Sequence, residues 1–487
     1  MADRGPAAVA PVRSSGVAIG ATVADLEISN AWLVDPFSER EGPGELVVSN
    51  GVLEAVNWLD GDEAAGIHDR GVIVAPGFID LHAHLREPGN EDAETVASGL
   101  AAAAHGGFTT VCAMPNTSPP ADEPGVLSRL RAAAAASGSP VALLPYGTVS
   151  VGRAGEALAP IGELADAGAV GFSDDGSPVR SGSILRNALM YAGMAGLAIV
   201  DHPEDLEQTV GAEATEGLVA TVLGLRGWPR SAEAAAVARD LAILADVIAD
   251  SPGARLHLTH LSTAAALDLV RAAKGRGLPV TCDVTPHHLA LTDEWLAGAR
   301  RWAWEAIDES GRARDPWADG VLIGAPYDPS TRVNPPLRSA YDAAACLAAL
   351  VDGTADAVAT DHAPHTVVDK AVEFGVAATG ISGIETALGL LLAAVDAGRL
   401  SLGRAIGALT AGPASILGPR LGRPAGLTEG APADLVVFDR ADGWLVSAAG
   451  LASRGKNSPL IGHALSGRVL LTLAGGKLAY EDPGLAD

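Results

Sequence analysis

The sequence has no apolar stretch of about 20 residues, the length that a membrane-spanning helix needs. Its hydrophobic residues, 48% of 487, are spread over short runs instead. We therefore expect no membrane span. Residues 1–15 also lack the apolar region of a secretory signal, and we expect them to form a frayed tail.

Cysteine and basic residues are scarce. Cys112, Cys282 and Cys346 stand far apart without a CxxC pair, which excludes a disulfide framework and a zinc ribbon and favours a cytoplasmic protein. Only 33 Lys and Arg stand against 59 Asp and Glu, giving a formal net charge of -26. Without clustered cations, binding to nucleic acid or to an acidic membrane surface is not expected.

Two patterns of apolar runs predict two domains. Short β-rich runs occupy 17–74 and return in 430–481, and we expect both chain termini to form one small β-sandwich domain. From 75 to 429, β-like runs alternate with helical segments, as in an α/β protein with parallel strands. Ionisable residues recur where these runs end, which favours a (β/α)₈ TIM-like barrel over a doubly wound open sheet. The irregular segment 293–329 predicts a long loop over the barrel mouth.

The strongest local signal is the pair His82 and His84 at the end of an apolar run. Residues two apart on a strand point to one face, so both imidazoles can bind one cation. Such a pair alone is weak evidence, but further ionisable residues end later runs: Asp174, Asp175, His202, His260 and Asp361. Buried ionisable groups are costly unless they are paired or metal-bound. Together they predict a site for zinc or a similar divalent ion.

A divalent ion in such a site predicts hydrolysis of an amide-type bond, because it makes water acidic and polarises a carbonyl group. Asp361 is the candidate general acid/base, a role compatible with metal binding. Arg86 is expected to hold a substrate carboxylate in a bidentate pair. Asn116 and Asn334 are candidates for amide hydrogen bonds, although Asn before Pro or Thr is more often a turn former.

Two motifs resemble the signatures of dihydroorotases. Residues 80–88 match DxHxHxRxP, and residues 359–365 followed by Lys370 match the second signature. The resemblance is closest to type I dihydroorotases and covers about 17–481. It implies reversible conversion of L-dihydroorotate to N-carbamoyl-L-aspartate in pyrimidine (UMP) biosynthesis, by hydroxide attack on the ring amide carbonyl. It also implies zinc, as one or two ions per subunit, and a homo-oligomer, and it leaves open a complex with aspartate transcarbamoylase.

The resemblance implies roles for individual residues. The metal-ligand positions are His82, His84, Asp175, His202, His260 and Asp361, with Asp361 also the catalytic acid/base. The substrate-binding positions are His84, Arg86, Asn116, Asn334, His365, Thr379 and Gly380. Thr379 stands where the family usually has Phe, so a hydroxyl replaces an apolar contact. Related hydantoinases and allantoinases use a carboxylated lysine between two metals, whereas residues 172–175 here contain none, as in type I dihydroorotases, where an aspartate takes its place.

Two alternatives stay open. The first is an enzyme of the same class that acts on a hydantoin, a dihydropyrimidine or allantoin. Arg86 argues against it, because these neutral rings lack a carboxylate for the guanidinium to pair with. The second is an inactive dihydroorotase-like subunit that serves as a scaffold for aspartate transcarbamoylase. The complete set of ligand positions argues against this reading.

Overall fold

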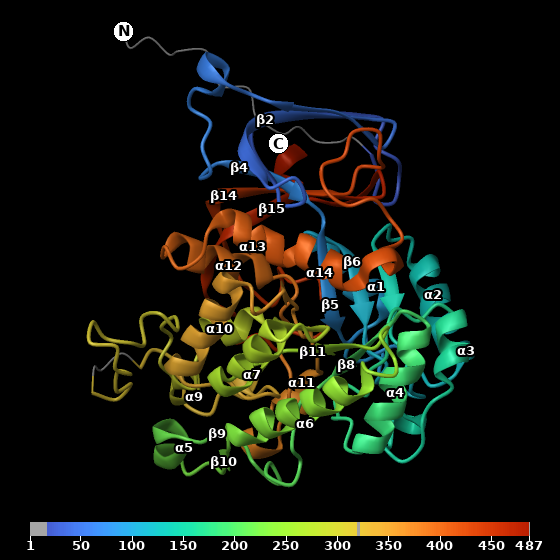
Figure 1. The fold of residues 1–487 in the computed structure, drawn as a ribbon. Helices are drawn as coiled ribbons and strands as arrows, with labels where there is room; N and C mark the ends of the chain where they lie inside the picture. The colour runs from blue at the N-terminus through green and yellow to red at the C-terminus, as the bar shows by residue number, and fades with distance from the viewer. Residues whose placement is uncertain (1–16, 319–321, 487) are drawn as a thin grey trace.

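The computed structural model describes residues 17–318 and 322–486, so the tail expected for 1–15 lies outside the described residues. A β sheet caps one end of the molecule, and an α/β barrel forms the rest (Figure 1). The N-terminal and C-terminal segments lie together at the sheet end, far from α5, β9 and β10 at the opposite end (Figure 1).

Short parallel strands form the centre of the barrel. They are β5 (Phe78–Ala83), β6 (Phe108–Ala113), β7 (Ala142–Pro145), β8 (Ala198–Asp201), β11 (Arg255–Leu258), β12 (Val280–Val284) and β13 (Ala357–Val358). Hydrogen bonds join β5-β6-β7 and β8-β11-β12-β13. Bridges from Phe172 to Gly147 and to Ile199, and from Ala83 to His362, close the ring. With the segment at Phe172, the strands fill the eight positions of a (β/α)₈ barrel, as the sequence predicted.

Helices cover the outside of this ring, which explains why every residue of β5 and β6 is buried. Many of these helices begin at a Ser or Thr whose side chain accepts a backbone N–H, as at Thr95, Thr263 and Ser339. The principal helices are α1 (Val96–His105), α2 (Pro124–Ser137), α3 (Ile161–Asp166), α4 (Gly182–Met194), α6 (Ser231–Val247), α7 (Ala264–Gly275), α10 (Ala340–Asp352), α12 (Ala387–Asp396), α13 (Leu402–Leu409) and α14 (Ala411–Leu417). Shorter elements are β9 (Ala214–Thr215), α5 (Leu218–Leu223), β10 (Gly227–Trp228), α8 (Pro286–Ala290), α9 (Glu294–Ala297) and α11 (Val367–Lys370).

The β domain combines both chain termini, which confirms that prediction. Its strands are β1 (Asp25–Asp35), β2 (Arg40–Ser49), β3 (Val52–Trp58), β4 (Val72–Pro76), β14 (Leu435–Leu445), β15 (Ala464–Ala474) and β16 (Lys477–Glu481). Within the described ranges they form one seven-stranded sheet in the order β16-β15-β14-β4-β1-β2-β3. At its centre, β14 runs antiparallel to β4, whereas β1 runs parallel to β4. Buried aliphatic side chains from both termini share one core cluster, which ties the two ends together.

An apolar cluster separates the site from the sheet end of the barrel. Leu81, Met114 and Val200 from the barrel segments pack in this cluster with Ala414 and Leu417 of α14. Because α14 also packs against β5 and β13, it closes this end of the ring. Polar side chains therefore gather at the other end, where the parallel strands finish.

Segment 293–329 is more structured than the loop the sequence predicted. It begins with α9, in which the Trp295 side chain is fully buried. Trp295 Nε1 donates to the Arg301 backbone oxygen at 2.8 Å, and a bridge joins Ala299 to Leu322. Much of the segment lies beside α10 (Figure 1).

Among the described residues, no helix is both long enough and apolar enough to cross a bilayer.

Candidate active site

Six ionisable side chains meet where the barrel strands end. His82 is the penultimate residue of β5, and the others lie in the segments that directly follow strands or the Phe172 bridge: His84, Asp175, His202, His260 and Asp361. All six are at most 5% exposed. The structure thus brings together every residue that the sequence predicted as a metal ligand.

His82 and His84 form the first pair of imidazoles. Their Nε2 atoms lie 3.3 Å apart. Asp175 Oδ2 is 3.1 Å from His82 Nε2 and 3.3 Å from His84 Nε2. Asp361 Oδ1 approaches the same two nitrogens at 3.5 and 3.2 Å. Two ring nitrogens and two carboxylate oxygens therefore face one point.

His202 and His260 form the second pair, with His202 Nδ1 2.9 Å from His260 Nε2. Asp175 Oδ1 lies 3.4 Å from each of these two nitrogens. One Asp175 oxygen thus faces the first pair and the other oxygen faces the second. The Asp175 carboxylate therefore lies between the two histidine pairs and contacts both.

The neighbouring Asp174 does not share this environment. Asp174 Oδ1 accepts from the backbone N–H groups of Val149 and Ser150 at 2.9 and 3.0 Å. Arg153 Nη2 donates to the Asp175 backbone oxygen at 2.6 Å and to the Asp174 oxygen at 3.1 Å. Asp174 therefore fixes a loop, and that loop directs Asp175 toward the histidines.

Outer hydrogen bonds turn the lone pairs of the first pair inward. Thr259 Oγ1 donates to Asp283 Oδ2 at 3.2 Å, so it accepts from His82 Nδ1 at 2.8 Å. His84 Nδ1 lies 2.9 Å from Asn116 Oδ1, an amide oxygen that only accepts. Because both Nδ1 atoms carry a proton, both Nε2 atoms present lone pairs to the centre when the rings are neutral. Fixing the ring tautomer in this way is typical of metal-binding histidines.

In the second pair, His202 follows the same logic. His202 Nε2 lies 3.0 Å from Glu204 Oε2, and a carboxylate oxygen requires a donor, so the lone pair of His202 lies on Nδ1. That lone pair faces His260 Nε2. Inward lone pairs beside the Asp175 carboxylate repel one another unless positive charge lies among them. The donor set therefore fits a divalent cation, with N and O ligands of the kind zinc takes.

Electrostatics also favour positive charge at this centre. Burial by itself would lower the pKa of His82, but the charge and hydrogen bond of Asp175, together with the charges of Asp361 and Asp283, raise the pKa to about 9. Burial likewise opposes the charged form of His202, and its hydrogen bond with Asp175 helps raise the pKa to about 10. Burial would raise the pKa of Asp361, but the hydrogen bond with His84 and the charge of His82 hold it below the usual value. Asp361 is thus an ionised carboxylate at neutral pH.

Three site residues have left-handed backbone conformations although none is glycine. The φ angles are 61° at Arg86, 41° at His260 and 46° at Asp361. Such conformations are uncommon for residues with a Cβ and cost of order 1–3 kcal/mol each. The surrounding fold thus holds strain at three positions that the sequence predicted to bind metal or substrate.

The substrate-binding positions predicted from the sequence surround this centre. Arg86 Nε donates to the Pro364 oxygen at 3.0 Å, and its Nη2 lies 3.3 Å from His365 Nε2. His365 Nε2 donates to the Thr379 oxygen at 2.8 Å. Burial, assisted by the charge of Arg86, lowers the pKa of His365 to about 4, so its ring is neutral. Of Arg86 and His365, only Arg86 therefore carries a positive charge.

Two side chains hold the loop that carries Thr379 and Gly380 in place. Lys370 Nζ donates to the oxygens of Ala378 at 2.7 Å and Gly380 at 3.1 Å. Burial lowers the pKa of Lys370 to about 7. Asn457 Nδ2 also donates to the Gly380 oxygen, at 2.9 Å. Contacts from both sides therefore hold this loop next to His365.

We expect Gly380→Ala to disturb this loop. Gly380 has φ +148°, and an added Cβ would lie 2.7 Å from the Ala363 Cβ and oxygen. We predict a lower melting temperature and a raised KM, because strain of about 1–3 kcal/mol must be relieved by moving the loop. Gly398→Ala is the control, since Gly398 also has a positive φ (+66°) but nothing within 4 Å of its Cβ position. An unchanged KM for Gly380→Ala would show that the loop does not contact substrate.

Sequence reasoning missed several residues that orient the site. Asp283 lies in β12 and accepts from the His260 backbone N–H at 2.6 Å. Its position near a strand end is the same signal that identified the other carboxylates. Glu204, two residues after His202, and Asn457, in the C-terminal part of the chain, offered no comparable signal.

Comparisons with known proteins agree with this geometry. A model of the family described as "Dihydro-orotase-like" matches residues 71–266, and the "Amidohydrolase family" model matches 231–479. The chain is 45% identical over 460 residues to a dihydroorotase of Anaeromyxobacter dehalogenans, covering 94% of this chain and 98% of that protein. It is 41% identical over 459 residues to a dihydroorotase of Pelotomaculum thermopropionicum, covering 94% and 99%. The chain belongs to the dihydroorotase family.

Similar solved structures come from a neighbouring branch of the amidohydrolases. The L-hydantoinase of Arthrobacter aurescens superimposes with a TM-score of 0.74 at 25% identity, covering 93% of this chain and 96% of that one. A D-hydantoinase gives a TM-score of 0.71 at 21% identity, covering 94% and 95%. The barrel with its β domain is therefore common to both branches. The higher identity to dihydroorotases separates this chain from the hydantoinase alternative.

Proposed function

We propose that this member of the dihydroorotase family interconverts L-dihydroorotate and N-carbamoyl-L-aspartate, a step of pyrimidine (UMP) biosynthesis. The observation that carries the proposal is the position of Asp175 between two histidine pairs, with Asp361 beside the first pair. This arrangement suits hydrolysis and closure of a cyclic amide. The same centre serves both directions, because the two reactions pass through the same transition state.

The donor set supports zinc, as one or two ions. His82, His84 and Asp361 form one group that could hold a metal ion, and His82, Asp175 and His260 form another. The lone pair of His202 Nδ1 adds a nitrogen ligand to the second group. When bound, a divalent ion supplies a water acidic enough to lose its proton near pH 7 and polarises a carbonyl oxygen.

Asp361 is proposed as the general acid/base. Its ionised carboxylate can take a proton from the attacking water as oxygen adds to the ring carbonyl carbon. It then gives that proton to the ring nitrogen as the carbon–nitrogen bond breaks, so the ring opens without a charged leaving group. In the reverse direction, Asp361 takes the proton from the carbamoyl nitrogen as that nitrogen attacks the carboxyl carbon, and it then gives this proton to the oxygen that leaves as water.

Arg86 and Asn116 are proposed to bind the substrate carboxylate, with His84, Asn334, His365, Thr379 and Gly380 around the ring. Arg86→Ala should raise KM about 10- to 100-fold, because hydrogen bonds to charged groups contribute roughly 1.5–3 kcal/mol. Dihydrouracil, which lacks the carboxylate, provides the control substrate. If both KM and kcat for dihydroorotate are unchanged, Arg86 does not bind that carboxylate.

The proposal is tested by metal analysis and by assays of the purified chain with dihydroorotate, hydantoin and dihydrouracil. We expect bound divalent ions, a preference for dihydroorotate, loss of turnover after chelation and recovery with zinc. A preference for hydantoin would favour the hydantoinase alternative. A chain that turns over none of the three would favour the scaffold alternative, although its complete ligand set argues against it.

Assembly and compartment stay predictions. We propose a homo-oligomer in the cytoplasm, and a complex with aspartate transcarbamoylase stays an open alternative. A size-exclusion experiment with light scattering, with and without purified transcarbamoylase, tests both forms of assembly.

A further inference from the structure

Glu204 is a buried carboxylate that contacts two parts of the site at once. Its Oε2 lies 3.0 Å from His202 Nε2 and 3.1 Å from Asn334 Nδ2. Its other oxygen, Oε1, accepts the Thr209 hydroxyl. The residue is only 7% exposed. A single oxygen thus joins a proposed metal ligand to a proposed substrate-binding residue.

The first consequence concerns His202. Because Glu204 only accepts, it holds the proton of the His202 ring on Nε2 and leaves Nδ1 free to face the centre. Without Glu204, the ring could carry its proton on Nδ1 and offer no lone pair there. The carboxylate therefore makes His202 a competent ligand.

The second consequence concerns Asn334. Its Nδ2 is taken by Glu204, so its Oδ1 points elsewhere. Oδ1 is buried and has no hydrogen-bond partner within the part of the chain that the structure describes. Buried polar atoms are normally satisfied, so this acceptor calls for a donor that arrives with a ligand. A cyclic amide carries such a donor, its ring N–H.

We propose that Glu204 is a positioning residue that sets the tautomer of His202 and the amide orientation of Asn334. In that orientation, Asn334 presents a carbonyl oxygen to a ring N–H of the substrate. This inference rests on the function proposed above and adds a specificity rule. Rings whose corresponding nitrogen is alkylated lack the donor and are rejected.

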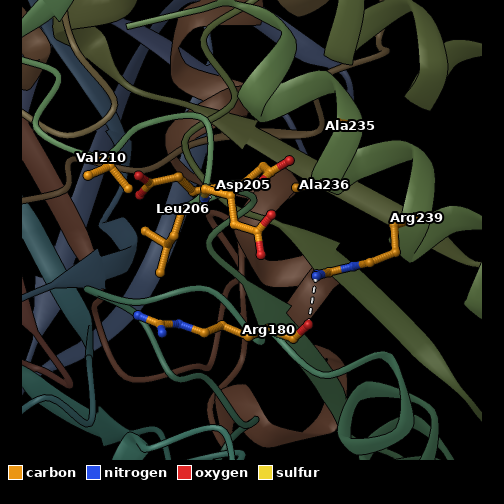
Figure 2. A pocket seen from close by; sticks show the side chains of 9 residues that line it. Arg180, Asp205, Leu206, Val210, Ala235, Ala236 and Arg239 are labelled. Carbon is orange, nitrogen blue, oxygen red and sulfur yellow. Dashed lines mark hydrogen bonds between the residues drawn. The ribbon is translucent and has the colours of Figure 1, made fainter.

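Glu204 also lines a pocket of about 500 Å³, which Figure 2 shows with Asp205, Leu206 and Arg239 around it. Arg239 lines the pocket, but its guanidinium donates to Asp240 Oδ1 and to the Arg180 backbone oxygen. Among the described residues, the ionisable group at hydrogen-bond distance from Glu204 is thus His202, on the side of the metal centre. Glu207 lines the same pocket and is exposed, so it offers a matched control.

The experiment compares the zinc-loaded chain with the variants E204A, E204Q, N334A, E204A/N334A and E207Q. Zinc dissociation constants come from competition with a chromophoric chelator, and kcat and KM are measured with L-dihydroorotate. E204A should weaken zinc binding about 10- to 100-fold, as is typical for loss of an outer partner of a ligand. It should also raise KM about 2- to 10-fold through Asn334.

E204Q should retain more of both properties, because its amide oxygen can accept from both His202 and Asn334. E207Q should match the unsubstituted chain. Since Glu204 acts on KM through Asn334, E204A should raise KM less in the N334A background than alone. Dihydroorotate methylated at the ring nitrogen that faces Asn334 should be a poor substrate for the unsubstituted chain. Its kcat/KM should not fall further in N334A.

Unchanged zinc affinity and KM in both Glu204 variants would overturn the assignment, even if their melting temperatures fell. Effects of E204A and N334A on KM that multiply would overturn the link to Asn334. If the unsubstituted chain binds no divalent ion or leaves dihydroorotate intact, the proposed function itself fails, and the same measurements reveal this.

Discussion

Replacing Asp361 by Asn should lower kcat by about 10²- to 10⁴-fold, the usual contribution of a general acid/base. Asparagine has nearly the same shape and keeps an oxygen that can face His84, 3.2 Å from the carboxylate in the native site. It cannot take up a proton from water, so the chemical step should fail while the fold persists. The measurement is kcat for both directions of the reaction, with circular dichroism as the check on folding.

Metal analysis of the same variant separates the two roles of Asp361. If its main role is proton transfer, bound metal should fall much less than kcat. Parallel loss of metal and activity would identify Asp361 as a ligand above all. Near-normal kcat in the metal-loaded variant would refute the acid/base role.

Asp175→Ala should abolish both metal retention and turnover. Asp175 is the carboxylate whose two oxygens face both histidine pairs, so its loss leaves four imidazoles without the negative charge between them. The loss of metal affinity should exceed the 10- to 100-fold effect typical of an outer partner. Metal content after dialysis and kcat/KM for dihydroorotate provide the readouts.

Asp174→Ala is the matched control, because it removes the neighbouring carboxylate. Asp174 accepts from the Val149 and Ser150 backbone and contacts no histidine at hydrogen-bond distance among the described residues. This variant should melt at a lower temperature and keep more metal than Asp175→Ala. If Asp174→Ala lost metal as completely as Asp175→Ala, the proposed role of Asp175 as a metal ligand would be wrong.

The barrel and the six-residue cluster could be predicted because both leave local marks in the sequence. Apolar runs show where strands lie, and an ionisable residue after such a run must lie at the carboxyl end of the barrel. That rule found His202, His260 and Asp361 although more than 150 residues separate the first from the last. The rule predicts that these residues lie at the same end of the barrel, but it does not give the distances between their side chains.

What the sequence did not reveal depends on contacts between distant segments. The roles of Glu204 and Thr259 follow from the atoms that they face, and these belong to other strands or loops. Asn457 reaches the Gly380 loop from the β-domain part of the chain. The division of the chain into domains at 74/75 and 429/430 stays a prediction. Strand β4 continues past the first boundary, to Pro76.

The pairing of β4 with β14 has a consequence for how the molecule forms. These two strands lie side by side, yet Val74 and its partner Val437 are separated by almost the whole barrel. Contacts between residues so distant along the chain slow folding. The ribosome synthesises the N-terminal part first. The edge of β4 that pairs with β14 therefore stays unpaired until β14 has been synthesised. The β domain is therefore completed last, after most of the catalytic barrel has been synthesised.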